Sequence, residues 1–109
     1  MRISGYRPMW VMAMFDLPVD SKAAKRNYAR FRKHLLKNGF AKMQFSVYIR
    51  HCASRESAEA HTGRIERAVP ADGEVRIIVV TDKQFERMRV FFGKRRKAPE
   101  PPPAQLELF

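Results

Sequence analysis

The feature that most constrains the fold is an apolar run from Met9 to Phe15, which ends on a carboxylate, Asp16, shortly before Pro18. A near-continuous apolar run of this length is typical of a central β-strand that is covered on both faces. Side chains alternate along a strand, so Trp10 and every second residue as far as Asp16 share one face. Pro18 has no N–H donor and ends the strand, which leaves Asp16 at its carboxyl end.

A basic helix is predicted after this strand. Asp20 or Ser21 can cap its first turn, and Asn38-Gly39 ends it, with Gly39 suited to a left-handed C-cap. One apolar stripe recurs at helical spacing and consists of Ala24, Tyr28, Phe31 and Leu35. Basic residues occupy another side of the same helix.

Residues 42–50 alternate in polarity, which predicts one strand or two strands joined by a tight bend or bulge. One side is expected to carry Met43, Phe45, Val47 and Ile49. The other side, which we expect on the open face of the sheet, is polar and carries Lys42, Gln44, Ser46, Tyr48 and Arg50.

The second half of the chain predicts another helix, a turn, a strand and a short helix. Ser54 can cap the helix, whose apolar side consists of Ala58, His61, Ile65, Ala68 and Val69. Residues 70–73 have turn composition, and residues 75–80 are rich in β-branched residues, as in strands. Thr81 and Gln84 resemble a capping box, so we expect a short helix through about Phe91, ended by Gly93.

This order of elements indicates an α+β fold: a ferredoxin-like βαββαβ sandwich whose antiparallel sheet has helices on one face. The domain spans 9–97, after a basic lead-in over 1–8. A proline-rich linker over 98–103 precedes a C-terminal segment, 104–109, which is a docking peptide or an added strand. The other sheet face would stay open, and a chain of 109 residues gains stability by burying it against a second copy. We therefore expect a homodimer.

The charge points to a polyanionic partner. Lys and Arg number 22 against 11 Asp and Glu, a net charge of +11, which favours nucleic acid. No acidic residue occurs between Ser21 and Arg55. The nucleic-acid-binding candidates are Lys22, Lys25, Arg26, Arg30, Lys33, Lys37, Arg50, Lys94, Arg95, Arg96 and Lys97.

The single cysteine, Cys52, suits a reducing cytosol and is expected as a small core or rim residue. We see no signal peptide and no apolar run that approaches the roughly 20 residues of a membrane span, so we expect a cytoplasmic protein without membrane contact.

No constellation for zinc binding or for nucleophilic catalysis is evident, and His34, His51 and His61 are expected as surface or partly buried structural residues. Asp16 is the remaining candidate. If two sheet faces pair about a two-fold axis, Asp16 can meet its symmetry mate, and two carboxylates would flank a hard cation such as Mg²⁺. Such a metal could activate water beside a phosphodiester. Alternatively, Asp16 is a turn residue that satisfies backbone N–H groups before Pro18.

Three segments carry a family resemblance: MFDLPV at 14–19, the basic stretch at 26–50 that ends in MQFSVYIR, and TDKQFERM at 81–88. Across about residues 9–93 the chain resembles the CRISPR-associated Cas-two (Cas2) family. It is most similar to the branch found beside the large RNA-guided effector nuclease of type II systems.

The resemblance implies a ferredoxin-like homodimer that is described as a metal-dependent endoribonuclease, some members cutting double-stranded DNA. Asp16 matches the family's catalytic, metal-linked aspartate, with Mg²⁺ or a similar divalent metal held between two subunits. The resemblance also implies a complex with the CRISPR integrase (Cas-one), in which the dimer bridges two integrase dimers and helps to hold prespacer DNA.

Two functions therefore compete, and we favour the first. In one, the protein is an adaptor that positions double-stranded prespacer DNA for the integrase, and nuclease activity is dispensable. In the other, it is a Mg²⁺-dependent endonuclease that cuts RNA or double-stranded DNA through paired Asp16 residues. A general ferredoxin-like RNA-binding domain is a third reading, disfavoured because such domains expose stacking aromatics on a sheet face that we expect to be polar here.

The C-terminal segment offers partner-docking candidates, which are Gln105, Leu106, Leu108 and Phe109. In the family, C-terminal segments help to contact the integrase, and this is the interpretation we favour. The same residues also resemble the bacterial sliding-clamp binding motif, which is the alternative partner.

Overall fold

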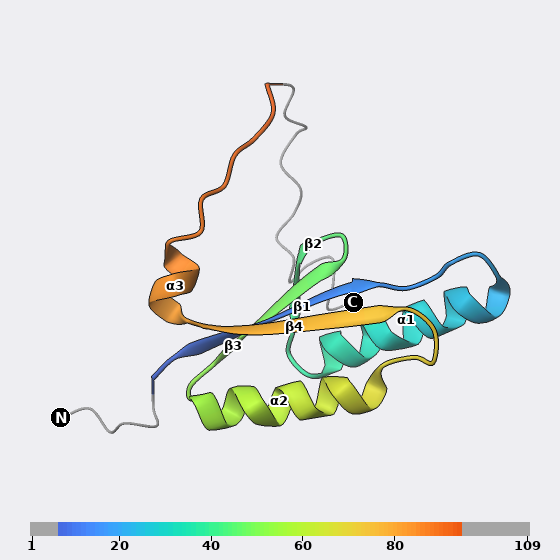
Figure 1. Cartoon of the computed structure of the whole chain (residues 1–109), viewed down its shortest axis with the longest axis horizontal. Coiled ribbons are helices and arrows are strands. Elements are labelled where there is room, and N and C mark those ends of the chain that lie inside the picture. Colours follow the sequence, from blue (N-terminus) through green and yellow to red (C-terminus); the bar gives the residue numbers. More distant parts are fainter. Residues whose placement is uncertain (1–6, 95–109) are drawn as a thin grey trace.

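In the computed structural model, which describes residues 7–94, strand β1 lies in the middle of a four-stranded antiparallel sheet. The strand order is β2-β3-β1-β4, and β1 pairs with β3 on one side and with β4 on the other. The elements are β1 (Met9–Asp16), α1 (Lys22–Lys37), β2 (Ala41–Gln44), β3 (Val47–Cys52), α2 (Arg55–Ala68), β4 (Glu74–Thr81) and α3 (Asp82–Glu86). Helices α1 and α2 cover the same side of the sheet (Figure 1). The predicted βαββαβ order and the α+β class are confirmed.

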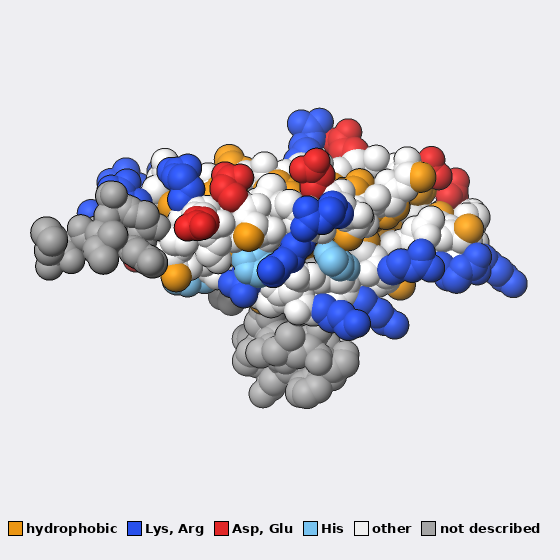
Figure 2. Space-filling view, turned by 90° about the horizontal axis from the view of Figure 1, so that it is seen from below, with side chains coloured by type: hydrophobic (Ala, Val, Ile, Leu, Met, Phe, Trp, Pro, Cys, Tyr) orange, Lys and Arg blue, Asp and Glu red, His pale blue; other side chains and the backbone are white. Residues whose placement is uncertain are grey.

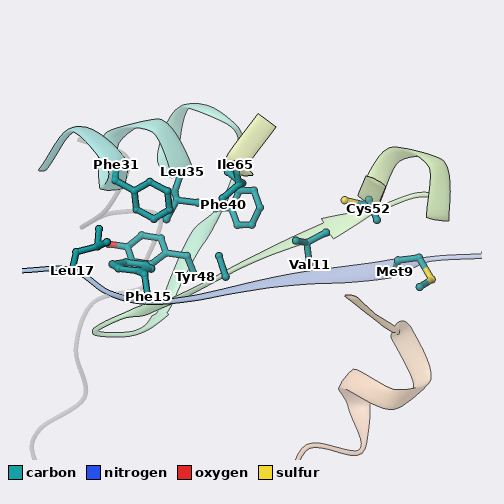
Figure 3. Packing of buried hydrophobic residues seen from close by; sticks show 12 residues of the cluster. Met9, Val11, Phe15, Leu17, Phe31, Leu35, Phe40, Tyr48, Cys52 and Ile65 are labelled. Atoms are coloured by element: carbon teal, nitrogen blue, oxygen red, sulfur yellow. The ribbon is translucent and has the colours of Figure 1, made fainter. Parts of the chain in front are cut away.

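The core lies between that side of the sheet and the two long helices. The inward residues of β1 are Met9, Val11, Ala13 and Phe15, all of them buried. Opposite them lie Phe31 and Leu35 from α1 and Ala58 and Ile65 from α2. Figure 3 shows the Phe15 ring among the rings of Phe31 and Tyr48, with ring centroids 5.3 and 5.6 Å away.

The helix boundaries follow the predicted caps. Ser21 and Ser54 accept hydrogen bonds from the backbone N–H groups three residues later, at 3.0 and 3.1 Å. Thr81 and Gln84 form the predicted capping box at the start of α3. Gly39 follows α1 with a φ of +82°, the left-handed conformation expected of it.

The other face of β1 is open, and it alternates as expected. Trp10, Met12 and Met14 are half-buried, and Asp16 at the end of the strand is exposed. Within the part of the chain described here, the two long helices cover one face of β1, and on the other face α3 reaches only the end that carries Trp10, whereas the sequence of β1 is typical of a strand covered on both faces.

The face assignment for residues 42–50 was wrong. The strands turn at Phe45–Ser46, and the pairing register shifts between Lys42 and Gln44. Val47 and Ile49 lie opposite Met14 and Met12, on the open face, whereas Tyr48 turns inward and is only 1% exposed. Tyr48 suits the core because its ring packs there while its hydroxyl accepts a hydrogen bond from Arg32 Nε at 2.9 Å. The open face is therefore apolar at β3, not polar.

Helix α3 is shorter than predicted. It ends at Glu86, not near Phe91, and the following segment extends away from the sheet (Figure 1). Val90, Phe91 and Phe92 are exposed by 63%, 79% and 63%. Side chains this exposed bury little apolar surface, so little favours continuing an amphipathic helix here.

Several predicted segments lie outside the described residues: most of the lead-in, Arg95 to Lys97, the linker over 98–103 and the segment over 104–109. None of the helices found between residues 7 and 94 has the length and apolar character needed to cross a membrane.

Gly73 offers a stability test because its φ is +96° and an added Cβ would lie 2.7 Å from Leu17 Cδ2 and 2.8 Å from the Asp16 carbonyl oxygen. We expect Gly73→Ala to lower the free energy of unfolding by about 1–3 kcal/mol. Gly63 is the matched control, since its Cβ would meet only Arg67 Nη1 at 3.4 Å. Gly63→Ala should stabilise the helix by about 0.5–1 kcal/mol. Urea unfolding of both variants measures the contrast, and equal effects would contradict it.

His61 predicts a pH dependence of stability. It is 8% exposed, and its Nδ1 has no hydrogen-bond partner within residues 7–94. Burial, followed by the positive charges of Arg50 and Arg64, lowers the pKa of His61 below its ordinary value of 6.5. Between that lowered pKa and 6.5 the unfolded chain binds the proton and the folded chain does not, so acidification destabilises the fold.

We therefore expect the melting temperature of the wild type to fall more between pH 7.5 and pH 5 than that of His61→Leu. Other titrating groups act in both proteins, so the difference between the two curves isolates His61. Parallel melting curves across this range would contradict the assignment.

Candidate nucleic-acid interface

Helix α1 exposes an uninterrupted row of positive charge. Lys22, Arg26, Arg30, Lys33 and Lys37 recur at helical spacing on one side of the helix, and all five are exposed. The buried Phe31 and Leu35 lie on roughly the opposite side, because a helix turns by 100° per residue. At 1.5 Å per residue the row is roughly 22 Å long. No acidic residue occurs anywhere in the helix. We call these five residues the basic row.

A shallow groove runs along this row. It has a volume of about 470 Å³ and is lined by Arg26, Ala29, Arg30, Lys33, His34 and Lys37. The His34 ring faces the second helix, where its Nε2 lies 3.3 Å from the carbonyl oxygen of Arg64. Figure 2 shows the helical side of the molecule, with Lys and Arg side chains along its lower right part and acidic side chains in the upper part, among further Lys and Arg side chains. The lower right part of this view therefore shows basic side chains but no acidic ones.

The other predicted nucleic-acid residues fall into different settings. Lys25 and Lys94 are exposed, whereas Arg95, Arg96 and Lys97 lie outside the described residues. Arg50 differs, because its Nε donates to the carbonyl oxygen of Asn38 at 2.7 Å and its Nη1 donates to that of His51 at 2.7 Å. Arg50 thus binds the backbone at the C-terminal end of α1 through Asn38, and its contact with nucleic acid stays a prediction.

Asp16 lies at the edge of the sheet with a second carboxylate opposite. It pairs in register with Glu74, the first residue of β4, so both side chains lie on the open face. Glu74 Oε1 in turn accepts a hydrogen bond from Arg76 Nε at 2.9 Å. Like charges directly opposite each other on a sheet are unfavourable, and Arg76 offsets part of that repulsion.

Sequence reasoning missed Glu74, because only the pairing of β1 with β4 brings it to Asp16, and strand order cannot be read from local patterns. Asp16 and Glu74 together supply hard oxygen donors of the kind that Mg²⁺ accepts, with waters completing its shell. Among residues 7–94 no group of three or more His, Cys, Asp or Glu side chains is placed to hold a metal. The pair in one chain therefore fits a hydrated Mg²⁺, not a closed all-protein site.

An aromatic cluster that the sequence did not predict lies at the opposite end of β1. Trp10 stacks on Phe85 with ring centroids 4.1 Å apart and contacts His51 edge to face at 5.0 Å. Its Nε1 donates to Asp82 Oδ1 at 2.7 Å. These contacts hold α3 against the open face of the sheet. Cys52 is a buried free cysteine, as predicted.

The family model described as CRISPR associated protein Cas2 matches residues 9–88. The CRISPR-associated endoribonuclease Cas2 of Parvibaculum lavamentivorans is 56% identical over 101 residues, which cover 93% of this chain and 100% of that protein. The protein of the same name from Flavobacterium psychrophilum is 45% identical over 108 residues and covers 99% of this chain and 94% of its own.

A solved structure supports the fold. A Cas2 crystal structure superposes with a TM-score of 0.54 at 24% identity, covering 86% of this chain and 99% of that one. At this identity the likeness concerns the fold alone. The predicted family is confirmed by the sequence matches, whereas the type II branch stays a prediction. By the family model and by relatives that match over nearly its whole length, this chain belongs to the CRISPR-associated Cas2 family.

Proposed function

We propose that this chain is a homodimeric adaptor of CRISPR adaptation that binds double-stranded prespacer DNA and bridges it to the CRISPR integrase. The observation that carries the proposal is the basic row on α1, a stripe of positive charge along the outer side of a rigid helix. Phosphate contacts of this kind fix the position of a duplex without reading its sequence. Such sequence independence suits a protein that must accept many different DNA fragments.

The length of the row suits a duplex backbone. Each strand of a duplex rises about 3.4 Å per nucleotide, so a row of roughly 22 Å runs beside about six nucleotides. Each phosphate that a Lys or Arg neutralises releases condensed counterions, which drives binding. A rigid helix also holds the charges in place before DNA arrives, which reduces the entropy lost on binding.

Two apolar surfaces support the homodimer. The open face carries half-buried Met12 and Met14 together with Ile78, which is 48% exposed. The exposed segment Val90–Phe92 follows α3, which is anchored to the same face through Trp10. A second copy would cover both surfaces, and burial of apolar area stabilises such contacts by about 25 cal/mol per Å².

Nuclease activity is the second candidate function, and the Asp16–Glu74 pair favours it. Relatives with 56% and 45% identity are named endoribonucleases. With Mg²⁺ bound, the metal would supply an activated water beside a phosphodiester. Asp16 and Glu74 would hold it on the open face, so a dimer formed through that face would bring a second pair toward the first. We place the nuclease second because DNA positioning needs only the basic row and the dimer.

The open face gives little support to the hypothesis of a general ferredoxin-like RNA-binding domain. Although that face is apolar, its indole, Trp10, is already stacked on Phe85. The docking of Gln105, Leu106, Leu108 and Phe109 on the integrase or on a sliding clamp stays a prediction about residues outside those described.

The basic row is tested by Arg30→Gln combined with Lys33→Gln. We expect this variant to bind a blunt 30-base-pair duplex roughly 10-fold more weakly at moderate salt. The slope of log K against log salt should fall in magnitude by about 1.8, because each lost phosphate contact removes about 0.9. Fluorescence anisotropy across a salt series measures both quantities.

The matched control is Arg55→Gln combined with Lys83→Gln, which removes the same charge from exposed positions in α2 and α3. If the control lowers affinity as much as the row variant, net charge alone accounts for binding and the basic row has no special role.

The variant Asp16→Ala distinguishes the adaptor function from the nuclease function. We expect this variant to support integration of a prespacer by the cognate integrase within about twofold of the wild type, since the adaptor role uses charge and dimerisation. Any Mg²⁺-dependent cleavage of RNA or DNA should disappear. Sedimentation of the variant, alone and with the integrase, verifies that its assemblies are intact. Lost integration by an intact complex would assign Asp16 a part in adaptation itself and overturn the adaptor reading.

A further inference from the structure

The tip of the β2–β3 hairpin carries an exposed aromatic side chain that the fold does not use. Phe45 is 75% exposed and forms the turn together with Ser46. It packs in no part of the core, which consists of other residues of the sheet and of the helices. An exposed phenyl ring loses the free energy that burial would give it, about 1.5–3 kcal/mol for a side chain of this size.

The turn itself does not require phenylalanine. Two-residue hairpin loops favour Asn and Gly, which adopt positive φ easily, whereas no non-glycine residue within 7–94 has a positive φ. The register shift between Lys42 and Gln44 accommodates this turn instead. A small polar residue would therefore fit position 45 at least as well. An exposed aromatic residue that the turn does not require is the kind of departure expected at functional positions.

A cation accompanies the ring. The Lys42 ammonium nitrogen lies 5.7 Å from the Phe45 ring centroid, within the range of a cation–π contact. An aromatic ring with a cation beside it is the usual combination for binding single-stranded nucleic acid: the ring stacks on a base and the cation attracts the phosphate. Stacking needs no particular base, since every base presents a π-face.

The hairpin tip lies beside the end of β1 that carries Asp16. The backbone N–H of Phe15 donates to the carbonyl oxygen of Ser46 at 3.0 Å, and Met14 pairs with Val47. In Figure 1 the β2–β3 turn lies above this end of β1, with α1 and α2 below the sheet. The aromatic ring, the cation and the exposed carboxylate thus belong to one edge of the molecule.

We propose that Phe45 and Lys42 form a stacking site for an unpaired nucleotide, with the base on the phenyl ring and its phosphate near the Lys42 ammonium. The site takes single-stranded nucleic acid in the form of a frayed or overhanging end of a duplex. This inference rests on the proposed nucleic-acid function and deepens it. The basic row binds paired phosphates, whereas the hairpin tip distinguishes unpaired bases.

The test compares Phe45→Leu, which keeps an apolar side chain without a π-face, with Phe45→Tyr, which keeps the ring. The probes are a blunt duplex, and the same duplex with a single-stranded overhang that contains the fluorescent base 2-aminopurine. We expect Phe45→Leu to bind the overhang probe about 5- to 100-fold more weakly than the wild type. It should lose the quenching that stacking produces, bind the blunt duplex within about twofold of the wild type, and keep the same salt slope. Phe45→Tyr should restore binding and quenching.

The outcomes distinguish a failure of the stacking-site proposal from a failure of the proposed nucleic-acid function. If Phe45→Leu binds the overhang as the wild type does while the basic-row variant is still impaired, the stacking site is wrong and the proposed function stands. If the wild type binds neither probe, the nucleic-acid function fails and this inference with it. If Phe45→Leu instead changes the sedimentation of the dimer, Phe45 belongs to the contact between copies, which also overturns the stacking site.

Discussion

Strand β1 is the element on which the rest of the molecule depends. Its inner face buries Met9, Val11, Ala13 and Phe15 against both long helices, and both of its edges are hydrogen-bonded, to β3 and to β4. The register along these edges is fixed because a slip of one residue would move the buried side chains to the open face. The same register sets Glu74 opposite Asp16 and places the hairpin tip beside Phe15. Each candidate functional group on that edge is therefore positioned by the core.

Local sequence signals predicted most of the fold because they act within a few residues. The Ser21 and Ser54 caps, the left-handed Gly39 and the capping box of Thr81 and Gln84 all depend on neighbouring backbone groups. Features that depend on distant partners were missed. From sequence alone Tyr48 belongs to a polar side, and only the fold shows that Arg32 supplies a hydrogen-bond partner for its buried hydroxyl. Glu74 was missed because its position opposite Asp16 depends on the pairing of β4 with β1.

In the candidate site, too, the features that depend on local sequence were predicted, whereas those that depend on distant partners were not. The basic row on α1 follows from composition and helical periodicity, so the sequence predicted its residues and its side of the helix. Arg50 has the same charge and was a candidate for the same reason, yet its guanidinium binds the backbone carbonyls of Asn38 and His51. Charge alone does not reveal that Arg50 is bound to backbone carbonyls, because that depends on which acceptors the fold places within its reach. The end of α3 is a similar case, because the apolar residues that follow Arg87 suit a helix by their sequence, yet Val90 and Phe91 stay exposed in the fold.

Three features of the surface do not contribute to the stability of an isolated chain, and all three lie away from the core. Val90–Phe92 and the open sheet face expose apolar side chains, the basic row concentrates like charge, and Phe45 puts an aromatic ring in water. Each arrangement is unfavourable in an isolated chain: exposed apolar area loses burial free energy, and like charges on adjacent helical turns repel. Their chemistries differ, since an apolar face suits another protein surface, a row of cations suits phosphates, and a ring beside an ammonium suits a base. The core accounts for the fold, and these three features are the ones on which the proposed contacts with protein and nucleic acid rest.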